Sequence, residues 1–309
     1  RGNTGWAAYD PQRESGRMTH LSLLGELRHA IEHDELSLYY QPKLDLVTGQ
    51  VRRAEALVRW IHPERGFVSP GEFVPFAEQT GAIKQLTRWV LARGIRQVAD
   101  WRAAGLDIAV SINVSTRDLM SPDLTEYVSD QLARQGTPPD RVCLEITESG
   151  FMEDPTHALA TLERLHGLGL MLSVDDFGTG YSSLAYLKKL PVSELKIDQS
   201  FVRDMVTNED DATIVRSTIE LGHNMGLEVT AEGVEDGAGL EMLRDLGCDQ
   251  AQGYFIAKPM PAPQFEDWLR ARAPEREVPE PADAQQPPRL TVVPLRPDGP
   301  AQRGDRARR

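Results

Sequence analysis

The chain has 309 residues, with 34 Lys and Arg against 47 Asp and Glu, and a net charge of −13. This acidity excludes a nucleic-acid polymer as the main partner, because a phosphate backbone is bound by surfaces rich in Lys and Arg. Two cysteines, Cys143 and Cys248, exclude a disulfide framework and favour a reducing, cytoplasmic compartment.

The two ends of the chain differ in composition from the middle. Residues 1–19 are polar and lack the apolar core of a signal peptide, so we interpret them as a linker or the remnant of an upstream domain. Residues 274–309 contain eight prolines and no aromatic residue, which predicts a disordered tail. Residues 20–273 are therefore predicted to form the folded domain.

Strand-like and helical patterns alternate through this domain. Helical patterns at 83–105, 157–169, 211–226 and 237–247 lie between many of the strand-like runs, which occupy 36–42, 53–60, 108–114, 142–147, 171–177, 194–198, 228–233 and 251–256. Eight candidate strands in such an order predict an α/β fold, a (β/α)8 TIM-like barrel. No glycine-rich dinucleotide or P-loop signature supports an open nucleotide-binding sheet.

The first two strand-like runs are joined by a short turn around Thr48 and Gly49. A connection this short forms a hairpin, whereas parallel strands need a long crossover. We therefore expect the first strand of the barrel to run antiparallel to its neighbour.

Polar side chains recur in or at the ends of successive predicted strands. They are Glu55, Asn113, Glu145, Asp175 with Asp176, Lys196, Glu232 and Gln252. The carboxyl ends of barrel strands meet on one face, where active sites lie. The pattern therefore predicts one site that holds five carboxylates, two amides and a lysine.

Five ionised carboxylates in one site repel one another, and a bound divalent cation relieves that repulsion. Carboxylate and amide oxygens suit Mg²⁺, Mn²⁺ or Ca²⁺, and two such ions can hold a water and a phosphate. Asp175 and Asp176 are a natural bridging pair. Lys196 would orient or polarise the attacking water, or stabilise the charge that grows on the phosphate.

Each of these residues also has an ordinary structural interpretation. A single acid at a strand end is usually a helix N-cap or a solvated loop residue. Asn113 could cap the following helix, and Lys196 could be a structural ion-pair partner. The recurrence at successive strand ends favours the metal site.

The segment 175–184, DDFGTGYSSL, places two glycines directly after a strand. Such spacing is typical of a tight, mobile loop, and the simpler interpretation is an ordinary connection from strand to helix. Loops on this barrel face often gate substrate, so a regulatory role is a further hypothesis.

The motifs together resemble the EAL-domain cyclic di-GMP phosphodiesterases. The run Glu55-Ala56-Leu57 is similar to the signature of that family. Five further segments follow in the family's order: 111–115, 144–149, 175–184, 195–198 and 231–235, with 252–260 after them. The resemblance covers nearly all of residues 20–270. It implies a barrel, Mg²⁺ or Mn²⁺ as cofactor with two ions bound, and hydrolysis of cyclic di-GMP to linear pGpG in bacterial signalling that regulates biofilms and motility.

The resemblance also implies roles for individual residues. The ligands of one metal would be Glu55, Asn113, Glu145 and Asp175, and those of the other Asp175, Asp176 and Glu232, with Gln252 nearby. Lys196 would activate the water, so that Lys196, Glu232 and Glu55 are the catalytic set. The substrate would meet Gln41, Leu57, Arg59, Asp198 and Glu235. The regulatory loop would comprise Glu148, Phe177, Gly178, Thr179 and Gly180.

Partners beyond the substrate follow only from the resemblance. The family suggests a homodimer formed near the DDFGTG loop. The segment WAAYDPQRE resembles the end of a GGDEF-type domain, which implies an upstream cyclase-like or sensor domain and allows a tether to the membrane through upstream regions. The family also contains members that bind cyclic di-GMP without cleaving it.

Two other functions stay open at this point. One is a catalytically silent cyclic di-GMP receptor that signals through the DDFGTG loop, although the complete set of site residues favours the enzyme. The other is a metal-assisted barrel enzyme that uses Lys196 as a base to remove a proton beside a carboxylate.

Overall fold

The computed structural model describes residues 23–148, 154–179 and 184–272 of the chain. Contacts divide the chain into one unit from Arg1 to Ala271 and a second from Arg272 to Arg309, and the fold described below belongs to the first. The predicted remnant at 1–19 and the predicted tail at 274–309 lie outside the described residues, so the predicted domain boundaries stay predictions.

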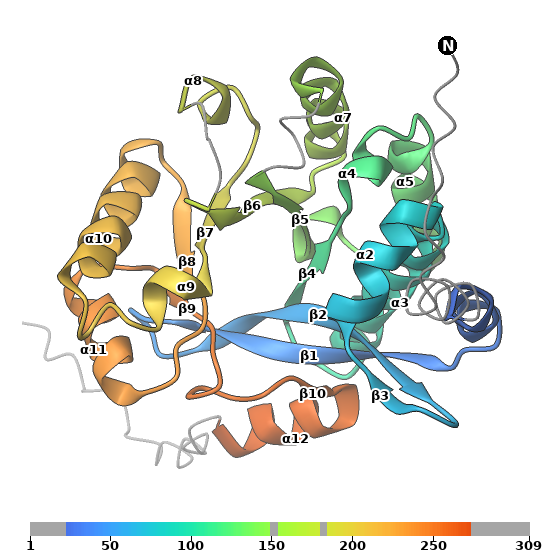
Figure 1. Cartoon of the computed structure of the whole chain (residues 1–309), viewed down its shortest axis with the longest axis horizontal. Helices are drawn as coiled ribbons and strands as arrows, with labels where there is room; N and C mark the ends of the chain where they lie inside the picture. The colour runs from blue at the N-terminus through green and yellow to red at the C-terminus, as the bar shows by residue number, and fades with distance from the viewer. Residues whose placement is uncertain (1–22, 149–153, 180–183, 273–309) are drawn as a thin grey trace, which may run out of the picture. The chain divides into compact units, whose positions relative to one another are not determined.

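Eight strands form a closed barrel. They are β1 (Leu36–Asp45), β2 (Val51–His62), β4 (Ala109–Asn113), β5 (Val142–Thr147), β6 (Met171–Phe177), β7 (Glu194–Ile197), β8 (Glu228–Ala231) and β9 (Gln250–Ala251). β2 and the strands from β4 to β9 pair in parallel in this order, and β1 closes the ring because it pairs with both β2 and β9. Both of these pairings are antiparallel. The predicted barrel with an antiparallel first strand is confirmed (Figure 1).

The hairpin between β1 and β2 is the feature that reverses the first strand. Gly49 takes the left-handed conformation with φ of 68°, which glycine adopts without steric cost. The Asp45 carboxylate accepts hydrogen bonds from the backbone N–H groups of Val47 and Thr48. The short turn predicted around Thr48 and Gly49 is therefore present. Two short strands extend the sheet: β3 (Gly66–Val68) pairs with β2, and β10 (Met260–Pro261) pairs with β1.

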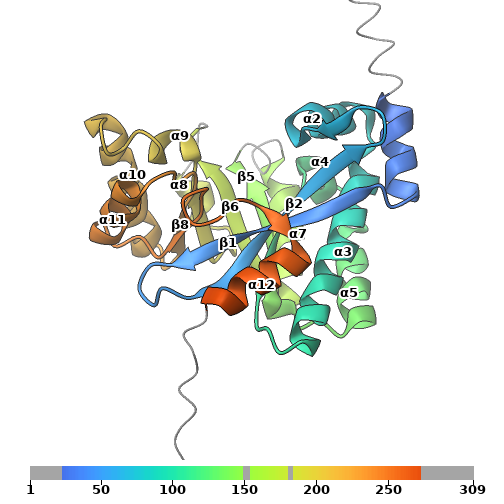
Figure 2. The same cartoon turned by 90° about the horizontal axis from the view of Figure 1, so that it is seen from below.

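Helices cover the outside of the barrel. The first helix occupies residues 23–32. The others are α2 (Pro70–Thr80), α3 (Ile83–Ala103), α4 (Thr116–Leu119), α5 (Leu124–Gln135), the 3₁₀ turn η1 (Pro139–Arg141), α7 (Pro155–Gly167), α8 (Leu184–Leu187), α9 (Gln199–Val202), α10 (Glu209–Asn224), α11 (Gly237–Asp245) and α12 (Ala262–Arg272). α3, α7, α10 and α11 confirm the four predicted helices. α12 lies beside β1 (Figure 2). Phe265 of α12 stacks on Trp101 of α3 with ring centroids 5.0 Å apart.

The prediction of a strand over 251–256 is wrong for most of its length, since β9 ends at Ala251. The next residues bond to the loop after β8: Val234 donates its N–H to the Gln252 carbonyl, and Phe255 donates its N–H to the Val234 carbonyl. The backbone approach is so close that a Cβ at Gly253 would lie 2.1 Å from the Val234 oxygen. The aromatic residues of this run, Tyr254 and Phe255, are exposed.

The hydrophobic core lies mainly between the strands and the surrounding helices, and the interior of the barrel is largely polar. On α3, Leu91, Ile95 and Val98 form a buried stripe against the strands. Inside the barrel, Ser111, Ser173 and Thr230 are buried on three parallel strands. This polar interior leads to the end of the barrel where the predicted site residues gather.

Candidate active site

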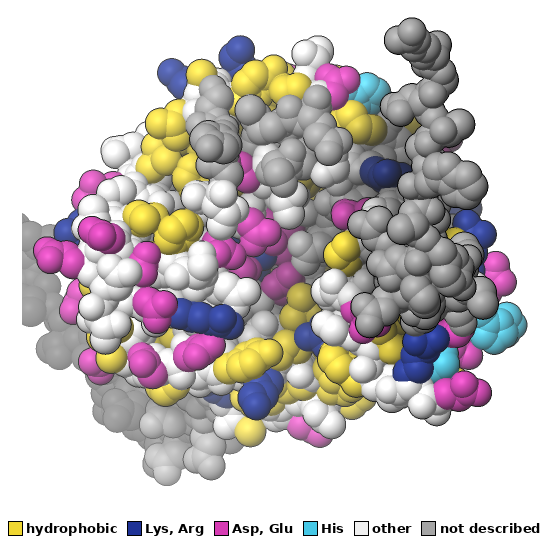
Figure 3. Space-filling view, in the orientation of Figure 1, with side chains coloured by type: hydrophobic (Ala, Val, Ile, Leu, Met, Phe, Trp, Pro, Cys, Tyr) yellow, Lys and Arg dark blue, Asp and Glu magenta, His cyan; other side chains and the backbone are white. Residues whose placement is uncertain are grey.

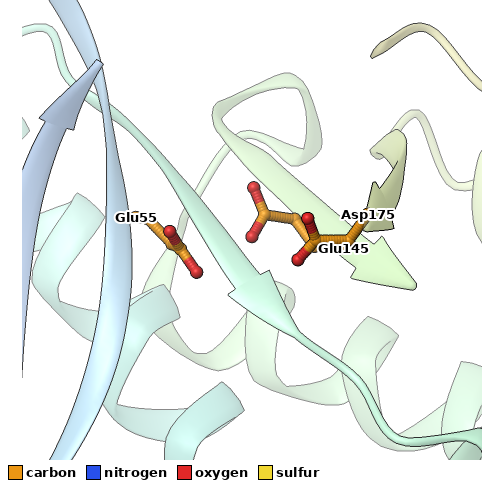
Figure 4. A group of neighbouring side chains, drawn as sticks. All are labelled: Glu55, Glu145 and Asp175. Carbon is orange, nitrogen blue, oxygen red and sulfur yellow. The ribbon is translucent and has the colours of Figure 1, made fainter. Parts of the chain in front are cut away.

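The structure brings together the polar residues that the sequence placed at strand ends. Glu55 lies on β2, Asn113 is the last residue of β4, Glu145 lies on β5, Asp175 and Asp176 lie on β6, Lys196 lies on β7, and Glu232 and Gln252 directly follow β8 and β9. Figure 3 shows acidic side chains gathered around a hollow near the centre of this face. Figure 4 shows the carboxyl groups of Glu55, Glu145 and Asp175 directed into the space that their strands enclose.

Lys196 is the centre of this cluster. Its ammonium nitrogen lies 3.0 Å from Glu145 Oε2, 3.1 Å from Asp175 Oδ1, 2.5 Å from Glu232 Oε1 and 3.8 Å from Glu55 Oε2. The side chain of Lys196 is completely buried. One ammonium group thus contacts four carboxyl groups that come from four different strands or strand ends.

Glu55 is held by two amide side chains. Asn113 Nδ2 donates to Glu55 Oε1 at 2.7 Å, and Gln252 Nε2 donates to Glu55 Oε2 at 2.6 Å. The same Gln252 nitrogen donates to Gln41 Oε1 at 3.1 Å, and Gln41 in turn donates to the Ala257 carbonyl. This chain of hydrogen bonds fixes both oxygens of Glu55 at the edge of the cluster.

The donor set fits divalent cations. Oxygens of Glu55, Glu145 and Asp175 lie within 4.8 Å of one another, and so do oxygens of Asp175, Asp176 and Glu232. Asp175 belongs to both groups, as a ligand shared between two ions does. Among the described residues, Gln252 Oε1 is buried without a hydrogen-bond partner, and a hard cation accepts such an oxygen as ligand. The observed oxygens therefore fit a hard divalent cation.

An irregularity in β6 directs two adjacent carboxylates to the same site. Successive side chains of a regular strand point to opposite faces. Asp176, however, has φ of 53°, and the pairing of β6 with β7 shifts register between Val174 and Phe177. The Asp176 N–H donates to Asp175 Oδ1 at 2.9 Å. The left-handed residue thus allows both carboxylates to reach the Glu232 oxygens, at a cost in backbone strain that is typical of functional sites.

The predicted regulatory loop is anchored by a buried glutamate. Glu148 is 2% exposed, and its Oε2 accepts a hydrogen bond from the Gly178 N–H at 3.0 Å. Thr179 Oγ1 donates to the Asp176 carbonyl at 2.8 Å, and Phe177 is buried. These contacts connect the loop to the acidic cluster, while Gly180 lies outside the described residues. The regulatory role stays a prediction.

Most of the predicted substrate-binding residues line one cavity. It has a volume of about 230 Å³ beside the acidic cluster and is lined by Gln41, Leu57, Arg59 and Glu235 together with Glu55 and Glu232. The Arg59 guanidinium donates to the Val58 carbonyl and lies over the ring of Tyr39. Asp198 does not line this cavity; it is the N-cap of α9 and accepts from the Ser200 N–H at 3.0 Å.

Sequence reasoning missed several residues here. Gln199, Arg203 and Tyr254 also line the cavity, and Arg203 pairs with Glu235 at 3.0 Å. Below the cluster, Lys43 and Glu194 are buried inside the barrel. The alternation of side chains along a strand could have identified these two residues. Lys43 follows Gln41 by two residues and Glu194 precedes Lys196 by two, so each shares the inward face of its strand with a predicted site residue.

The electrostatics of the site favour cation binding. Burial raises the pKa of Glu55 to about 7, against the attraction of Lys196. Burial also raises the pKa of Asp176 to about 6, with a further contribution from Asp175. Burial raises the pKa of Glu232 well above its ordinary value. Burial therefore opposes ionisation of these three carboxyl groups, and a bound divalent cation would offset that cost.

Glu145 behaves in the opposite way. Burial acts to raise its pKa, but the ammonium groups of Lys196 and Lys43 outweigh burial and hold the pKa of Glu145 at about 2. The pKa of Lys196 is raised well above its ordinary value, because the surrounding carboxylates outweigh the effect of burial. Lys196 is therefore an ammonium ion and Glu145 a carboxylate at neutral pH.

These shifts predict how stability depends on pH. The folded-state pKa values of Glu55 and Asp176 exceed their ordinary values of 4.5 and 3.8, so the folded state binds more protons than the unfolded state near pH 6. The metal-free protein should lose stability as the pH rises from about 5 to about 8, with Tm falling by roughly 5 °C. Thermal unfolding in a chelator checks this, and Mg²⁺ should reverse the loss. A metal-free Tm that rises over this range contradicts the assignment.

Among the described residues, no helix is both long enough and apolar enough to cross a membrane.

Comparison with known proteins identifies relatives of this fold and site. Residues 24–259 match the family model of the EAL domain. The bifunctional diguanylate cyclase/cyclic di-GMP phosphodiesterase MucR of Pseudomonas aeruginosa is 42% identical over 266 residues, which are 86% of this chain and 39% of that protein. The cyclic di-GMP phosphodiesterase PA2567 of the same species is 40% identical over 267 residues, which are 86% of this chain and 46% of that protein. The chain thus spans less than half the length of these relatives.

A solved structure extends the comparison to three dimensions. The PaMucR phosphodiesterase in complex with c-di-GMP superimposes with a TM-score of 0.76 at 44% identity, and the match covers 79% of this chain and 99% of that one.

Proposed function

The chain belongs to the EAL domain family, and on this premise we propose that it is a metal-dependent phosphodiesterase that hydrolyses cyclic di-GMP to linear pGpG. The observation that carries the proposal is the buried Lys196, surrounded by carboxylates of Glu55, Glu145, Asp175 and Glu232 at the open end of the barrel. Such a combination of carboxylate ligands and a fixed positive charge suits hydrolysis of a phosphodiester, because bound cations would activate water and the ammonium group would stabilise charge on the phosphate.

The residues divide between two cation positions. Glu55, Asn113, Glu145 and Asp175 would hold one Mg²⁺ or Mn²⁺ ion. Asp175, Asp176 and Glu232 would hold the other, with Gln252 beside them. When bound, the ions supply an activated water and stabilise negative charge on the phosphate.

Lys196 contributes a positive charge at a fixed position. Because its pKa is raised, it donates hydrogen bonds as an ammonium ion and does not take a proton in the metal-free protein. We assign it to orient the water and to stabilise the charge that develops on the phosphate. Its complete burial excludes competing contacts with bulk solvent.

Arg59 is placed to hold the substrate. It lies at the edge of the acidic cavity, and a guanidinium binds phosphate oxygens through paired donors. A second, more apolar cavity of about 400 Å³ also includes Leu57 and Arg59 in its lining. Two cavities that meet at one arginine suit a ligand with two flat bases on either side of a phosphate. Gln41, Asp198 and Glu235 complete the proposed substrate set.

A direct assay tests the proposal. Purified protein with Mg²⁺ and cyclic di-GMP should release pGpG, which chromatography separates from the substrate. Excess EDTA should reduce hydrolysis to the background rate, and added Mg²⁺ or Mn²⁺ should restore it, since the carboxylates need a cation to act on a phosphate. Binding of cyclic di-GMP without any release of pGpG would instead establish the silent receptor. Enolisation of a carboxylate substrate without phosphodiester cleavage would favour the base-catalysed enzyme.

The wider context is part of the same proposal. MucR carries a diguanylate cyclase activity besides its phosphodiesterase activity. We propose a GGDEF-type or sensor domain upstream of this chain, a homodimer and a cytoplasmic site of action. Analytical ultracentrifugation of the purified chain tests the dimer.

A further inference from the structure

A second buried lysine, Lys43, lies below the acidic cluster. Its ammonium nitrogen is 2.8 Å from Glu145 Oε1 and 3.0 Å from Glu194 Oε1. Lys43 lies on β1, whose neighbours are β2, β9 and β10, whereas Glu145 and Glu194 lie on β5 and β7. The side chain therefore crosses the interior of the barrel to reach the opposite strands.

Lys43 and Lys196 hold different oxygens of the same carboxylate. Lys43 contacts Glu145 Oε1, and Lys196 contacts Glu145 Oε2 at 3.0 Å. Glu145 is 1% exposed. The contact on one oxygen restrains rotation of the carboxylate about its terminal bond and so favours the orientation in which the other oxygen faces the cluster.

Lys43 is itself fixed by a second set of contacts. Glu194 accepts from the Lys43 ammonium through both oxygens, at 3.0 and 3.2 Å. Thr230 Oγ1 donates to Glu194 Oε1 at 2.5 Å, and all three side chains are buried. These residues lie on β1, β7 and β8. The position of the ammonium group is thus determined by three strands of the barrel.

We propose that Lys43 is a positioning residue for the metal centre: it holds Glu145 Oε1 so that Glu145 Oε2 is presented to the cation. This inference rests on the proposed function. A buried Lys–Glu pair adds little stability compared with apolar residues of similar size. Stability alone therefore does not explain why Lys43 and Glu194 are buried here, whereas the contact of Lys43 with Glu145 gives them a role at the metal centre.

Two variants distinguish a positioning role of Lys43 from a role in packing alone. Lys43→Met/Glu194→Gln removes one positive and one negative charge together, so no new unpaired charge is buried. Glu194→Gln alone keeps the Lys43 contact with Glu145, and its amide oxygen still accepts from Thr230. Mn²⁺ binding is measured by electron paramagnetic resonance without substrate, so the readout does not depend on hydrolysis.

The double variant should bind Mn²⁺ about 10- to 100-fold more weakly than the parent protein, as loss of an outer hydrogen-bond partner does at metal sites. Glu194→Gln should stay within about threefold of the parent. Loss of the Lys43 charge alone would strengthen cation binding. Unchanged or tighter Mn²⁺ binding by the double variant, or an equal loss in both variants, therefore overturns the proposal.

The measurements also distinguish failure of this inference from failure of the proposed function. If the parent protein binds Mn²⁺ but releases no pGpG, the proposed function fails while the comparison of variants still decides the role of Lys43. Thermal unfolding confirms that each variant is folded. Should the double variant not fold, Lys43→Gln/Glu194→Gln replaces it, because the shorter amide removes the charged donor from Glu145 and keeps a polar group in the interior.

Discussion

Glu55→Ala is expected to lower the turnover of cyclic di-GMP by about a thousandfold, the loss typical when one charge-stabilising group leaves an active site. The substitution removes a metal ligand and the acceptor of the Asn113 and Gln252 hydrogen bonds. The fold should survive, because burial opposes ionisation of this carboxyl group and its pKa is raised to about 7. Steady-state kinetics at several Mg²⁺ concentrations measure the effect.

The control for this substitution is Glu64→Ala. Glu64 is an exposed residue in the turn between β2 and β3, so its loss changes the net charge of the protein by the same amount without touching the cluster. Circular dichroism and thermal unfolding should show both variants folded. If Glu55→Ala keeps near-normal activity while Glu64→Ala does too, Glu55 is not a ligand of the catalytic metal.

The barrel and its irregular first strand could be predicted because both follow from local rules. Glycine at position 49 permits a tight left-handed turn, and a connection this short can join only antiparallel strands. The predicted runs at 142–147 and 171–177 coincide with β5 and β6, because their buried apolar residues follow the strand alternation, with polar side chains on the interior face of the barrel. Helix α12 was not predicted, because Phe265 is its only buried residue and its apolar pattern is weak.

The residues that converge in the acidic cluster could be predicted, but their geometry could not. Position at a strand end identifies which residues converge, since all parallel strands end on one face. Strand alternation, however, places Asp175 and Asp176 on opposite faces, and only the left-handed conformation of Asp176 brings both to the site. That conformation depends on the pairing of β6 with β7, which is a long-range property.

Contacts across the interior of the barrel could not be predicted from the sequence either. Lys43 and Glu145 are 102 residues apart and lie on strands that do not pair, so no local pattern joins them. Asp198 has a structural role besides the proposed one. Its place after a strand is explained by its N-cap hydrogen bond in α9, and its proposed contact with substrate needs a separate test.

Lys196→Met is expected to lower kcat by about a thousandfold and to change KM by much less, because the lost ammonium group acts on charge that develops in the transition state. Lys196 contacts Glu55, Glu145, Asp175 and Glu232 and is completely buried, so it cannot contribute much to binding the substrate from solution. Single-turnover kinetics give the chemical step, and calorimetry with cyclic di-GMP and Mg²⁺ gives the affinity.

The same substitution should make the stability of the protein depend more strongly on divalent cations. Removing one member of a buried ion-pair cluster typically costs about 3–5 kcal/mol of stability, and here four carboxylates would lose their common partner. Divalent cations replace that charge, so the metal-free variant should melt well below the parent protein and regain most of the difference in Mg²⁺. The exposed Lys188, changed to methionine, provides the control and should leave kcat, KM and the response to Mg²⁺ unchanged. A pure loss of affinity in Lys196→Met, with kcat preserved, would place Lys196 among the substrate-binding residues and remove it from the chemical step.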